Sequence, residues 1–505
     1  MNRMLYKRVY RQVVMVVVSV ALCVVLSSLC LADDLGERVQ KFTLKNGLTL
    51  LVLERHINPT VSLYIRHRVG AVDEDSDKNA GTAHILEHMR FKGTTTIGTT
   101  NYEKEREILL DIDQIGWKLD LEKKKGDAAD RAQVEKLEQE LSMLRQEEKK
   151  YIAANEIDRL YTENGAVGLN ASTGYDMTSY HVNLPANKIE LWARIEADRW
   201  ANPVFREFYS ERNVVCEERR QTIESKPERK LMEQFLAAAF IVHPYRRPII
   251  GWKSDMEFLN KKYMTEFFNI FYVSNRSCIA VVGDVSAQAV FELVDRYFGS
   301  IPSRKVPPIH ATKEPQQQGE RRIVLMADAN PQLIIGYHKP TLPSYEDYVF
   351  DVIDAVLTRG RSSRLIKSLV EEQGIAQSVS TSNGFPGARY PNLFTIFATP
   401  RHPHANSELE DAIYKELMRL KQEPVTAFEI EKAKNQLRAA LLRRMASNTG
   451  LASMLSYFET ITGDYRYITQ YMETIDKITP KDIMNAASQY LTTKNRTVAL
   501  LEKDR

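Results

Sequence analysis

The chain has 505 residues, of which 43% are hydrophobic and 27% are charged, and its formal net charge is +3. A chain of this length and composition can bury large cores, so we expect a globular protein of two to four domains. The nearly neutral balance gives no sign of nucleic acid as a partner, because nucleic acid is bound chiefly by clustered positive charge.

The first 32 residues have the order of a secretory signal peptide. An apolar run, VVMVVVSVALCVVLSSLCLA, ends at Ala32 and follows four basic residues, Arg3, Lys7, Arg8 and Arg11. This order predicts export, cleavage after Ala32 and a mature chain in a bacterial periplasm. Because about 20 apolar residues can also span a bilayer, a retained inner-membrane anchor is the alternative. Loss of residues 1–32 removes four positive charges and no negative charge, and changes the net charge from +3 to −1.

Cysteine usage limits the kinds of site that the mature chain can build. Only Cys216 and Cys278 remain once the signal peptide is removed. Two cysteines form at most one disulfide and cannot supply a cysteine-rich zinc site. Any zinc site must therefore take most of its ligands from other residue types.

Strand patterns open the mature chain. FTLKNGLTLLVLE, residues 42–54, has two alternating apolar runs around Asn46-Gly47, which is a strong signal for a tight hairpin. VSLYIRHRVG, residues 61–70, is typical of another strand, and residues 79–91 have the pattern of a helix. The motif that follows lies on this predicted helix.

HILEHMRFKGT, residues 84–94, places two histidines four residues apart with a glutamate directly before the second. At about 100° per residue, His84 and His88 lie about 40° apart on a helix, and Glu87 lies about 60° to the other side of His84. One helix face can therefore hold a zinc ion between two imidazoles with a carboxylate beside it. The alternative is a helix with two surface histidines and a glutamate in a salt bridge.

Residues 103–160 have a different character, with apolar residues at helical spacing among dense charge. Two heptad-like series are separated by KKKGD, and they comprise Ile108, Ile112, Ile115 and Leu119, then Val134, Leu137, Leu141 and Leu144. This pattern predicts an antiparallel helical hairpin that turns near Gly126. It is either an arm or lid that binds a partner or a solvated structural insertion, and we favour the insertion.

The remaining chain mixes strands and helices. TSYHVNLP at 178–185 and SCIAVVGDV at 277–285 are typical of strands, and residues 303–320, rich in Pro and Gln, predict a linker. We expect an N-terminal domain over 33–302 and a second domain over 321–505. Hairpins mixed with helices, rather than strict alternation, favour the α+β class.

A third zinc ligand is available in SERNVVCEERR, residues 210–220, on a predicted helix. Glu211 and Glu218 are two turns apart and share a face, whereas Glu217 points about 100° away. We expect Val214 and Val215 to pack that face inward. We therefore predict Glu218 as the ligand and Glu211 as an acceptor that orients the site. The alternative is an ordinary charged helix face.

With these residues the chain resembles the pitrilysin/insulinase-type zinc metallopeptidases, of the short two-domain type that includes mitochondrial processing peptidase subunits. HILEHMRFKGT is similar to the His-x-x-Glu-His motif of this family with its following Phe-Lys-Gly-Thr, and ERNVVCEE is similar to its downstream glutamate segment. The resemblance extends from about Val39 to the C-terminus.

The resemblance implies two homologous α+β domains, each an antiparallel sheet layered with helices, which enclose a chamber. It implies that LNAST, residues 169–173, is an edge strand to which the substrate backbone adds, with Asn170 and Ala171 flanking the scissile bond. The predicted hairpin of residues 103–160 enters between the zinc helix and this strand, so we expect it near the rim of the chamber.

The predicted activity is zinc-dependent hydrolysis of peptides or unfolded segments, with one Zn²⁺ per chain held by His84, His88 and Glu218 and with Glu87 as the general base. Two other functions of the same fold remain open, a non-catalytic structural subunit and a peptide-binding holdase. Neither a structural subunit nor a holdase needs the three zinc ligands together with Glu87.

The C-terminal domain lacks two residues that the resemblance leads one to expect. Family members present an Arg and, seven residues later, a Tyr to the substrate carbonyl, but the matching positions here hold Val370 and Gln377. Valine cannot donate a hydrogen bond, and Gln lacks the acidity of a phenol. We therefore expect a heterodimer with a homologous partner that supplies Arg and Tyr. The alternatives are a homodimer in which Arg364 or the Arg389-Tyr390 pair substitutes, and a weakly active enzyme that works alone.

Overall fold

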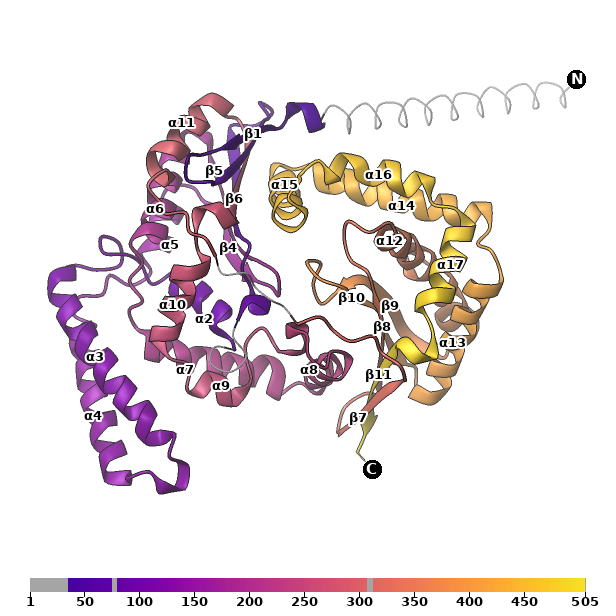
Figure 1. The fold of residues 1–505 in the computed structure, drawn as a ribbon, viewed down its shortest axis with the longest axis horizontal. Helices are drawn as coiled ribbons and strands as arrows, with labels where there is room; N and C mark the ends of the chain where they lie inside the picture. Colours follow the sequence, from indigo (N-terminus) through magenta and orange to yellow (C-terminus); the bar gives the residue numbers. More distant parts are fainter. Residues whose placement is uncertain (1–34, 75–79, 307–311, 505) are drawn as a thin grey trace, which may run out of the picture.

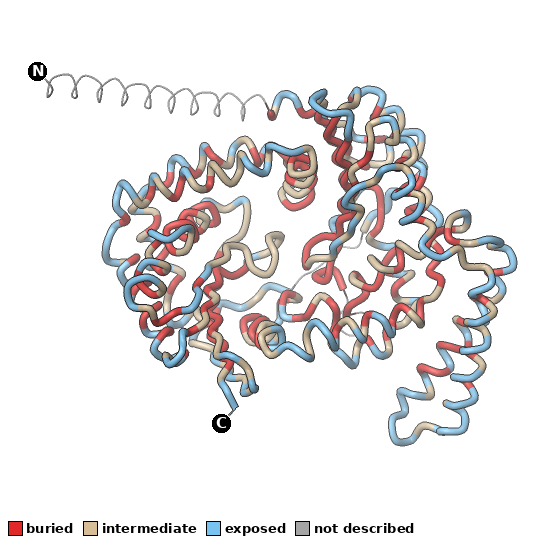
Figure 2. The backbone as a smooth tube through the Cα atoms, turned by 180° about the vertical axis from the view of Figure 1, so that it is seen from behind, coloured by how far each residue is buried: buried red, intermediate tan, exposed pale blue. Residues whose placement is uncertain are grey.

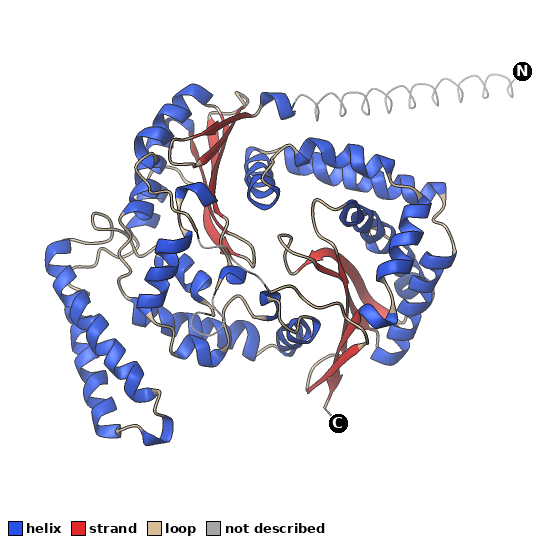
Figure 3. Ribbon diagram, viewed as in Figure 1, coloured by secondary structure: helices blue, strands red, loops and turns tan. Residues whose placement is uncertain are grey.

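The structure is a computed structural model that describes residues 35–74, 80–306 and 312–504. The signal peptide predicted for residues 1–32 lies outside these ranges. Within them, every helix is too short or too polar to cross a membrane. The described chain forms two sheets, each with helices against it (Figures 1 and 3).

The first sheet has six strands in the order β1-β2-β6-β3-β5-β4. Their bounds are Gln40–Thr43, Thr49–Glu54, Thr60–His67, Val167–Thr173, Thr178–Pro185 and Ser277–Gly283 for β1 to β6. The β2–β6 pair is parallel and the other pairs are antiparallel. The predicted hairpin is confirmed, because β1 pairs with β2 across a turn in which Gly47 has φ of +81°. Glycine adopts such positive φ values without steric cost.

The second sheet repeats this topology. Its strands are ordered β7-β11-β8-β10-β9, with bounds Arg321–Ala327, Gln332–Lys339, Ala376–Phe385, Asn392–Pro400 and Arg496–Lys503 for β7 to β11. Only its β7–β11 pair is parallel. This is the order of the first sheet without β1, so the two halves of the chain have the same strand arrangement. The predicted α+β class is confirmed, with one parallel pair added to each largely antiparallel sheet.

Helices fill the rest of both halves. In the first half they are α2 (Thr82–Met89), α3 (Tyr102–Lys123), α4 (Arg131–Glu148), α5 (Glu156–Thr162), α6 (Ile189–Ala201), α7 (Phe208–Arg219), α8 (Pro227–Ala239), α9 (Lys253–Glu257), α10 (Lys261–Phe271) and α11 (Ala287–Phe298). In the second half they are α12 (Tyr345–Thr358), α13 (Asn406–Gln422), α14 (Ala427–Met445), α15 (Asn448–Thr462), α16 (Tyr467–Lys477) and α17 (Pro480–Tyr490). The helix predicted over residues 79–91 thus corresponds to α2.

The predicted helical hairpin consists of α3 and α4, and Gly126 lies in its turn with φ of +58°. It projects from the side of the first half that faces away from the second sheet (Figure 1). The expectation that it lies at the rim of a chamber between the halves is therefore wrong. Arg212 of α7 holds α3 on this outer side, because its guanidinium donates to both carboxylate oxygens of Asp120 at 2.7 and 2.8 Å.

The two halves exchange one helix each. α15 packs on the first sheet, where Leu451 and Leu455 join a buried cluster with Leu51 and Leu53 of β2. α8 packs on the second sheet, where the buried ring of Phe235 joins residues of β8, β10 and β11. Figure 2 shows both helices as largely buried on the side that faces the opposite sheet. Each sheet is thus covered in part by a helix from the other half of the sequence.

We expect Phe235→Ala to lower the free energy of unfolding by about 3–5 kcal/mol, the usual cost of deleting a buried ring. Phe235 is fully buried, and a Cβ added at Gly336 of β8 would come within 2.5 Å of its ring. Denaturant unfolding of the purified chain measures the effect. The control is Phe428→Ala on α14, because Phe428 is 74% exposed and its loss should change stability by less than about 0.5 kcal/mol. If both variants lowered the free energy of unfolding by the same amount, packing of α8 would not stabilise the second sheet.

Candidate metal centre

The short helix α2 carries His84, Glu87 and His88. It begins after Gly81, whose φ is +88°, and its first amides are satisfied by a buried carboxylate. Glu74 accepts hydrogen bonds from the backbone N–H groups of Gly81 and Ala83 at 3.0 and 2.8 Å. The opposite face of α2 is fully buried in the core of the first half through Ile85, Leu86 and Met89. The three polar side chains are therefore left on the open face.

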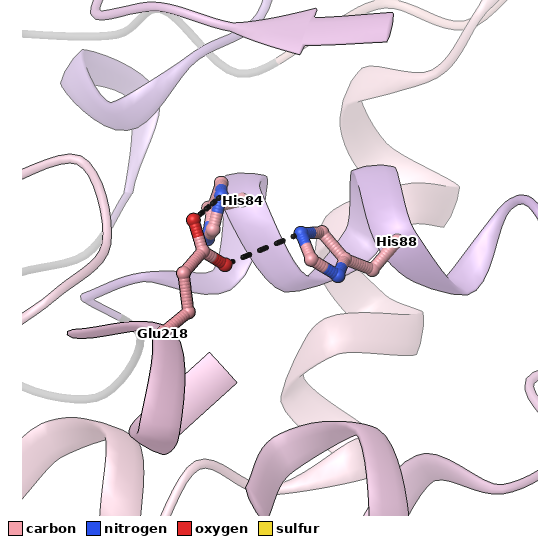
Figure 4. A group of neighbouring side chains, drawn as sticks. All are labelled: His84, His88 and Glu218. Carbon is pink, nitrogen blue, oxygen red and sulfur yellow. Dashed lines mark ion pairs between the residues drawn. The ribbon is translucent and has the colours of Figure 1, made fainter. Parts of the chain in front are cut away.

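α7 brings Glu218 to the two histidines (Figure 4). The distance is 3.8 Å from His84 Nε2 to Glu218 Oε1 and 3.6 Å from His88 Nε2 to Glu218 Oε2. Among the residues that the structure describes, this is the one group of three His, Cys, Asp or Glu side chains whose donor atoms lie within 4.8 Å of one another. Zinc binds nitrogen and oxygen at about 2.0–2.2 Å, which places tetrahedral donors about 3.3 Å apart. The observed spacing fits such an ion with little adjustment.

Glu211 fixes the tautomer of His88. Glu211 Oε1 lies 2.9 Å from His88 Nδ1, and Glu211 Oε2 accepts from Lys92 Nζ at 2.7 Å. Burial would raise the pKa of Glu211, but the bonds from His88 and Lys92 outweigh it and lower this pKa to about 2. An ionised Glu211 keeps the proton of His88 on Nδ1, so the lone pair on Nε2 is free to bind a metal.

His84 is held in its neutral form by its surroundings. Burial, and next the neighbouring His88, lower the pKa of His84 to about 4. Its Nδ1 is buried and has no hydrogen-bond partner among the described residues, while its Nε2 faces Glu218. A neutral imidazole is the form that binds a metal.

We expect Glu211→Gln to weaken zinc affinity about 10–100-fold, the usual effect of removing a carboxylate that orients a histidine ligand. Competition with a zinc chelator measures the affinity. The matched control is Glu207→Gln, because Glu207 also contacts Lys92 Nζ, at 3.3 Å, whereas the described carboxylates that contact His88 are Glu211 and Glu218. If both variants bound zinc equally, the contact between Glu211 and His88 would not matter for the site.

Glu87 lies where the edge strand β4 ends. Its Oε2 accepts a hydrogen bond of 2.6 Å from Oγ1 of Thr173, the last residue of β4. Burial raises the pKa of Glu87, and the bond from Thr173 reduces the shift. Sequence reasoning did not identify Thr173, although it is the final residue of the quoted LNAST segment. The contact places a proton acceptor beside both the metal ligands and the edge strand.

The two predicted substrate-binding residues lie on β4. This strand pairs with β5 on one side and forms the edge of the sheet on the other. Asn170 and Ala171 face His181 and Tyr180 across the pair, and the Asn170 side chain accepts from the backbone N–H of Ala171 at 2.9 Å. An open strand edge can add another extended chain.

The neighbours of Glu218 on α7 differ in their exposure. Glu217 points away and pairs with Arg220 at 2.6 Å, as the helical spacing of Glu217 and Glu218 predicts. Val215 is buried, but Val214 is 52% exposed, so the expectation that both pack inward is wrong for Val214. Val214 lies one turn before Glu218, about 40° away around the helix, and therefore shares its open side.

Arg364 and Arg389, the two arginines of the second half that could replace the missing Arg of the family, both form ion pairs. Arg364 donates to both carboxylate oxygens of Glu429, at 2.7 and 3.1 Å, and Arg389 donates to both oxygens of Asp73, each at 3.0 Å. Val370 packs at the edge of the second core, and Gln377 is exposed on β9. Each arginine would have to leave its carboxylate to reach a substrate.

Two family models match the sequence in succession. One, described as Insulinase (Peptidase family M16), matches residues 51–124 and 142–253, and one described as the peptidase M16 inactive domain matches residues 259–437. The chain belongs to peptidase family M16. The break in the M16 match at residues 125–141 falls on the turn and the first part of α4, at the end of the hairpin farthest from the body.

Named relatives match over almost the full length of the chain. The zinc protease PqqE of Helicobacter pylori is 24% identical over 471 residues, which covers 92% of each chain. An uncharacterized zinc protease of Bacillus subtilis, YmxG, is 22% identical and covers 92% of this chain and 98% of that protein. These names support a zinc peptidase family for this chain.

Solved structures share the fold. The crystal structure of a protease from Helicobacter pylori aligns with a TM-score of 0.77 at 23% sequence identity. The alignment covers 92% of this chain and 99% of that protease. The periplasmic protease PqqL of Escherichia coli aligns with a TM-score of 0.68 at 15% sequence identity. The alignment covers 92% of this chain and 48% of PqqL, which is a longer chain. A peptidase M16 inactive domain from Pseudomonas fluorescens, with a TM-score of 0.70, has the same architecture.

Proposed function

We propose that this M16 chain is a zinc-dependent endopeptidase that hydrolyses peptides or unfolded segments. The observation that carries this proposal is the meeting of two histidine Nε2 atoms with the Glu218 carboxylate, while Glu87 stands on the same helix face. His84, His88 and Glu218 would hold one Zn²⁺. A structural subunit would need neither this ligand set nor a half-buried carboxylate beside it.

Bound zinc would supply a Lewis acid that makes water more acidic and polarises a carbonyl oxygen. Glu87 would accept a proton from the attacking water and deliver it to the amine that leaves. The pKa of Glu87 is raised by burial, towards the pH at which a group both accepts and releases protons well. Thr173 would orient the Glu87 carboxylate through its hydrogen bond.

The open edge of β4 would hold the substrate. A peptide that adds to this edge binds through its main chain, which requires an extended segment but few particular side chains. Asn170 and Ala171 would flank the scissile bond, and Thr173 joins the same strand to Glu87. Such binding favours unfolded segments over folded proteins as substrates.

A homologous partner chain would complete the site by supplying an Arg and a Tyr. Val370 and Gln377 cannot take these roles, and the ion pairs of Arg364 and Arg389 support the heterodimer over the homodimer. We further propose a periplasmic location. The order of residues 1–32 and the printed name of PqqL, a periplasmic protease, support it.

Assays of the purified chain, alone and with a homologous chain that lacks the zinc motif, test this proposal. Zinc content and cleavage of a quenched peptide are measured in each sample. We expect one zinc per chain, weak cleavage alone and strong cleavage with the partner. Full cleavage by the chain alone, unchanged by the partner, would contradict the split site. Zinc without cleavage in any assembly, but with peptide binding, would favour the holdase.

A further inference from the structure

An exposed apolar stripe runs along the outer face of α3. The inner face of this helix is buried in the core of the first half through residues such as Ile112 and Leu119. On the outer face, Leu110, Trp117 and Leu121 are 62%, 51% and 44% exposed. At about 100° per residue, these three side chains lie within about 40° of one another around the helix. Large apolar side chains that gather on one exposed line are typical of an interaction surface.

The stripe has the spacing of a coiled-coil seam. Four exposed residues, here called the outer seam, follow one another at intervals of four, three and four: Leu110, Gln114, Trp117 and Leu121. Side chains at this spacing interdigitate with those of a second helix that lies alongside. Within the part of the chain that the structure describes, α4 packs on the inner side of α3 and no helix covers the outer seam. The seam is therefore open to a helix of another molecule.

The charges beside the outer seam are complementary to those of a second copy of α3. In a parallel coiled coil, a residue directly before one seam position lies beside the residue five places later on the other helix. Arg106 then faces Asp111 of the second copy, and Asp113 faces Lys118 of the second copy. The two-fold axis repeats both pairs, so all four contacts are attractive.

These charged side chains are available for such contacts. Arg106, Asp111 and Lys118 are exposed, and none of them takes part in the ion pairs that α3 forms among the described residues. Asp113 Oδ1 accepts from Lys261 Nζ at 3.0 Å, which leaves its other carboxylate oxygen for a second donor. Ion pairs beside a seam select the partner helix more than they add affinity. They therefore favour α3 itself as the helix that the seam accepts.

The position of the body favours the parallel direction. Lys261 and Arg212 of the body bind Asp113 and Asp120 of α3, which lie roughly 80° around the helix from the middle of the outer seam. A two-fold axis along the helices places the two bodies on opposite sides of the pair, whereas an antiparallel pair places them on the same side. An antiparallel pair would also bring the Asp113 and Asp120 flanks of the two copies together, and like charges repel.

We propose that α3 is a dimerisation helix, through which two copies of this chain associate by a parallel pairing of their outer seams. Trp117 and the two leucines would be the buried anchors, and Gln114 would face its own copy and fix the register, as a polar seam residue does. The hairpin of α3 and α4 is then an arm that binds a partner, in place of the solvated insertion favoured from the sequence.

This contact is independent of the proposed peptidase. The hairpin projects away from the second sheet (Figure 1), and the zinc ligands and Glu87 are not part of the outer seam. The pairing of two α3 helices therefore leaves the metal centre to the homologous partner chain that would complete it. Self-association through α3 and completion of the active site are two separate contacts.

Sedimentation velocity of the purified chain over a range of concentrations tests the proposal. We expect an equilibrium between monomer and dimer, and Trp117→Asp should weaken the dimer by about 30-fold or more, as loss of a central interface Trp does. The matched control is Met143→Asp, because Met143 is 65% exposed on α4 but lies outside the outer seam. It should leave the equilibrium unchanged. A chain that is monomeric at every concentration, or a dimer that Trp117→Asp does not weaken, would overturn the proposal.

Charge reversal tests whether the second helix is α3 itself. Arg106→Asp and Asp111→Arg should each weaken the dimer by about tenfold, because each replaces two attractions by two repulsions. An equimolar mixture of the two variants should recover the dimer, since each Asp then faces an Arg. The control is Lys136→Asp, at an exposed position of α4, which should have no effect. Weakening without recovery in the mixture would show that the seam does not bind a second α3.

Cross-linking tests the direction of the pair. Leu121→Cys places a thiol beside its own copy in the parallel pair, but in an antiparallel pair with matched seams the two thiols lie about 16 Å apart. Mild oxidation should link Leu121→Cys chains and should link neither Met143→Cys chains nor the unmodified chain. A dimer without this cross-link would overturn the parallel seam. None of these measurements depends on hydrolysis, so failure of the peptidase proposal would leave the dimer standing, and the reverse also holds.

Discussion

Glu87→Gln should keep its zinc and lose peptide hydrolysis by about 10²–10⁴-fold, the usual contribution of a general base. The three ligand side chains remain in this variant, and glutamine preserves the size of the side chain and its bond from Thr173. Only the ability to take up a proton is lost. Zinc content by elemental analysis and cleavage of a quenched peptide, both on the same preparation, check the expectation.

The control for Glu87 is Glu163→Gln, because Glu163 is exposed and, among the described residues, forms an ion pair with Arg159 alone, at 3.6 Å. This variant should retain full activity. Full hydrolysis by Glu87→Gln would show that another group accepts the proton. Loss of zinc from Glu87→Gln would instead mean that Glu87 helps to shape the metal centre.

Glu218→Gln should lose zinc, and peptide hydrolysis with it. The Glu218 carboxylate faces Nε2 of both histidines, and its replacement by a neutral amide removes the negative charge that the site offers to a dication. The loss of affinity should be at least as large as the roughly 10–100-fold expected for Glu211→Gln. Dialysis against a chelator followed by zinc analysis measures it.

Glu217→Gln provides the matched control for Glu218, since the two glutamates are neighbours on one helix. Glu217 is engaged with Arg220 and Gln221 at the surface, so its loss should leave zinc and activity unchanged. A greater loss of zinc from Glu217→Gln than from Glu218→Gln would refute the ligand assignment.

Those features of the site that depend on one helix could be predicted from the sequence. Helical periodicity alone places His84, Glu87 and His88 on one face, and it separates Glu218 from Glu217 on α7. The structure brings these faces together at 3.6–3.8 Å. Thr173 was not identified because its role depends on where β4 ends relative to α2, a tertiary relation that strand alternation does not contain.

The sequence also predicts where each helix or strand lies in the chain better than it predicts which other elements that helix or strand packs against. The hairpin of α3 and α4 was predicted from its apolar series, but its direction depends on Arg212 and Asp120, 92 residues apart. In the same way, the apolar faces of α8 and α15 predict burial and do not say against which sheet. Both helices cover the sheet of the other half, which no local pattern would reveal.

This exchange of helices decides which parts of the chain can move as rigid bodies. We expect the first sheet to move with α15 and the second sheet to move with α8, because each pair shares a buried apolar cluster. The cluster of α8 also contains Ala71, Val72 and Tyr175 of the first half, and these contacts must part when the bodies separate. The chain crosses from one body to the other before and after α8, before and after α15, and once more between α11 and β7. Separation of the bodies to admit a peptide must therefore bend the backbone at all of these crossings together, including those next to Pro227 and Gly463. Stiffening any one of them should slow substrate entry without touching the metal centre.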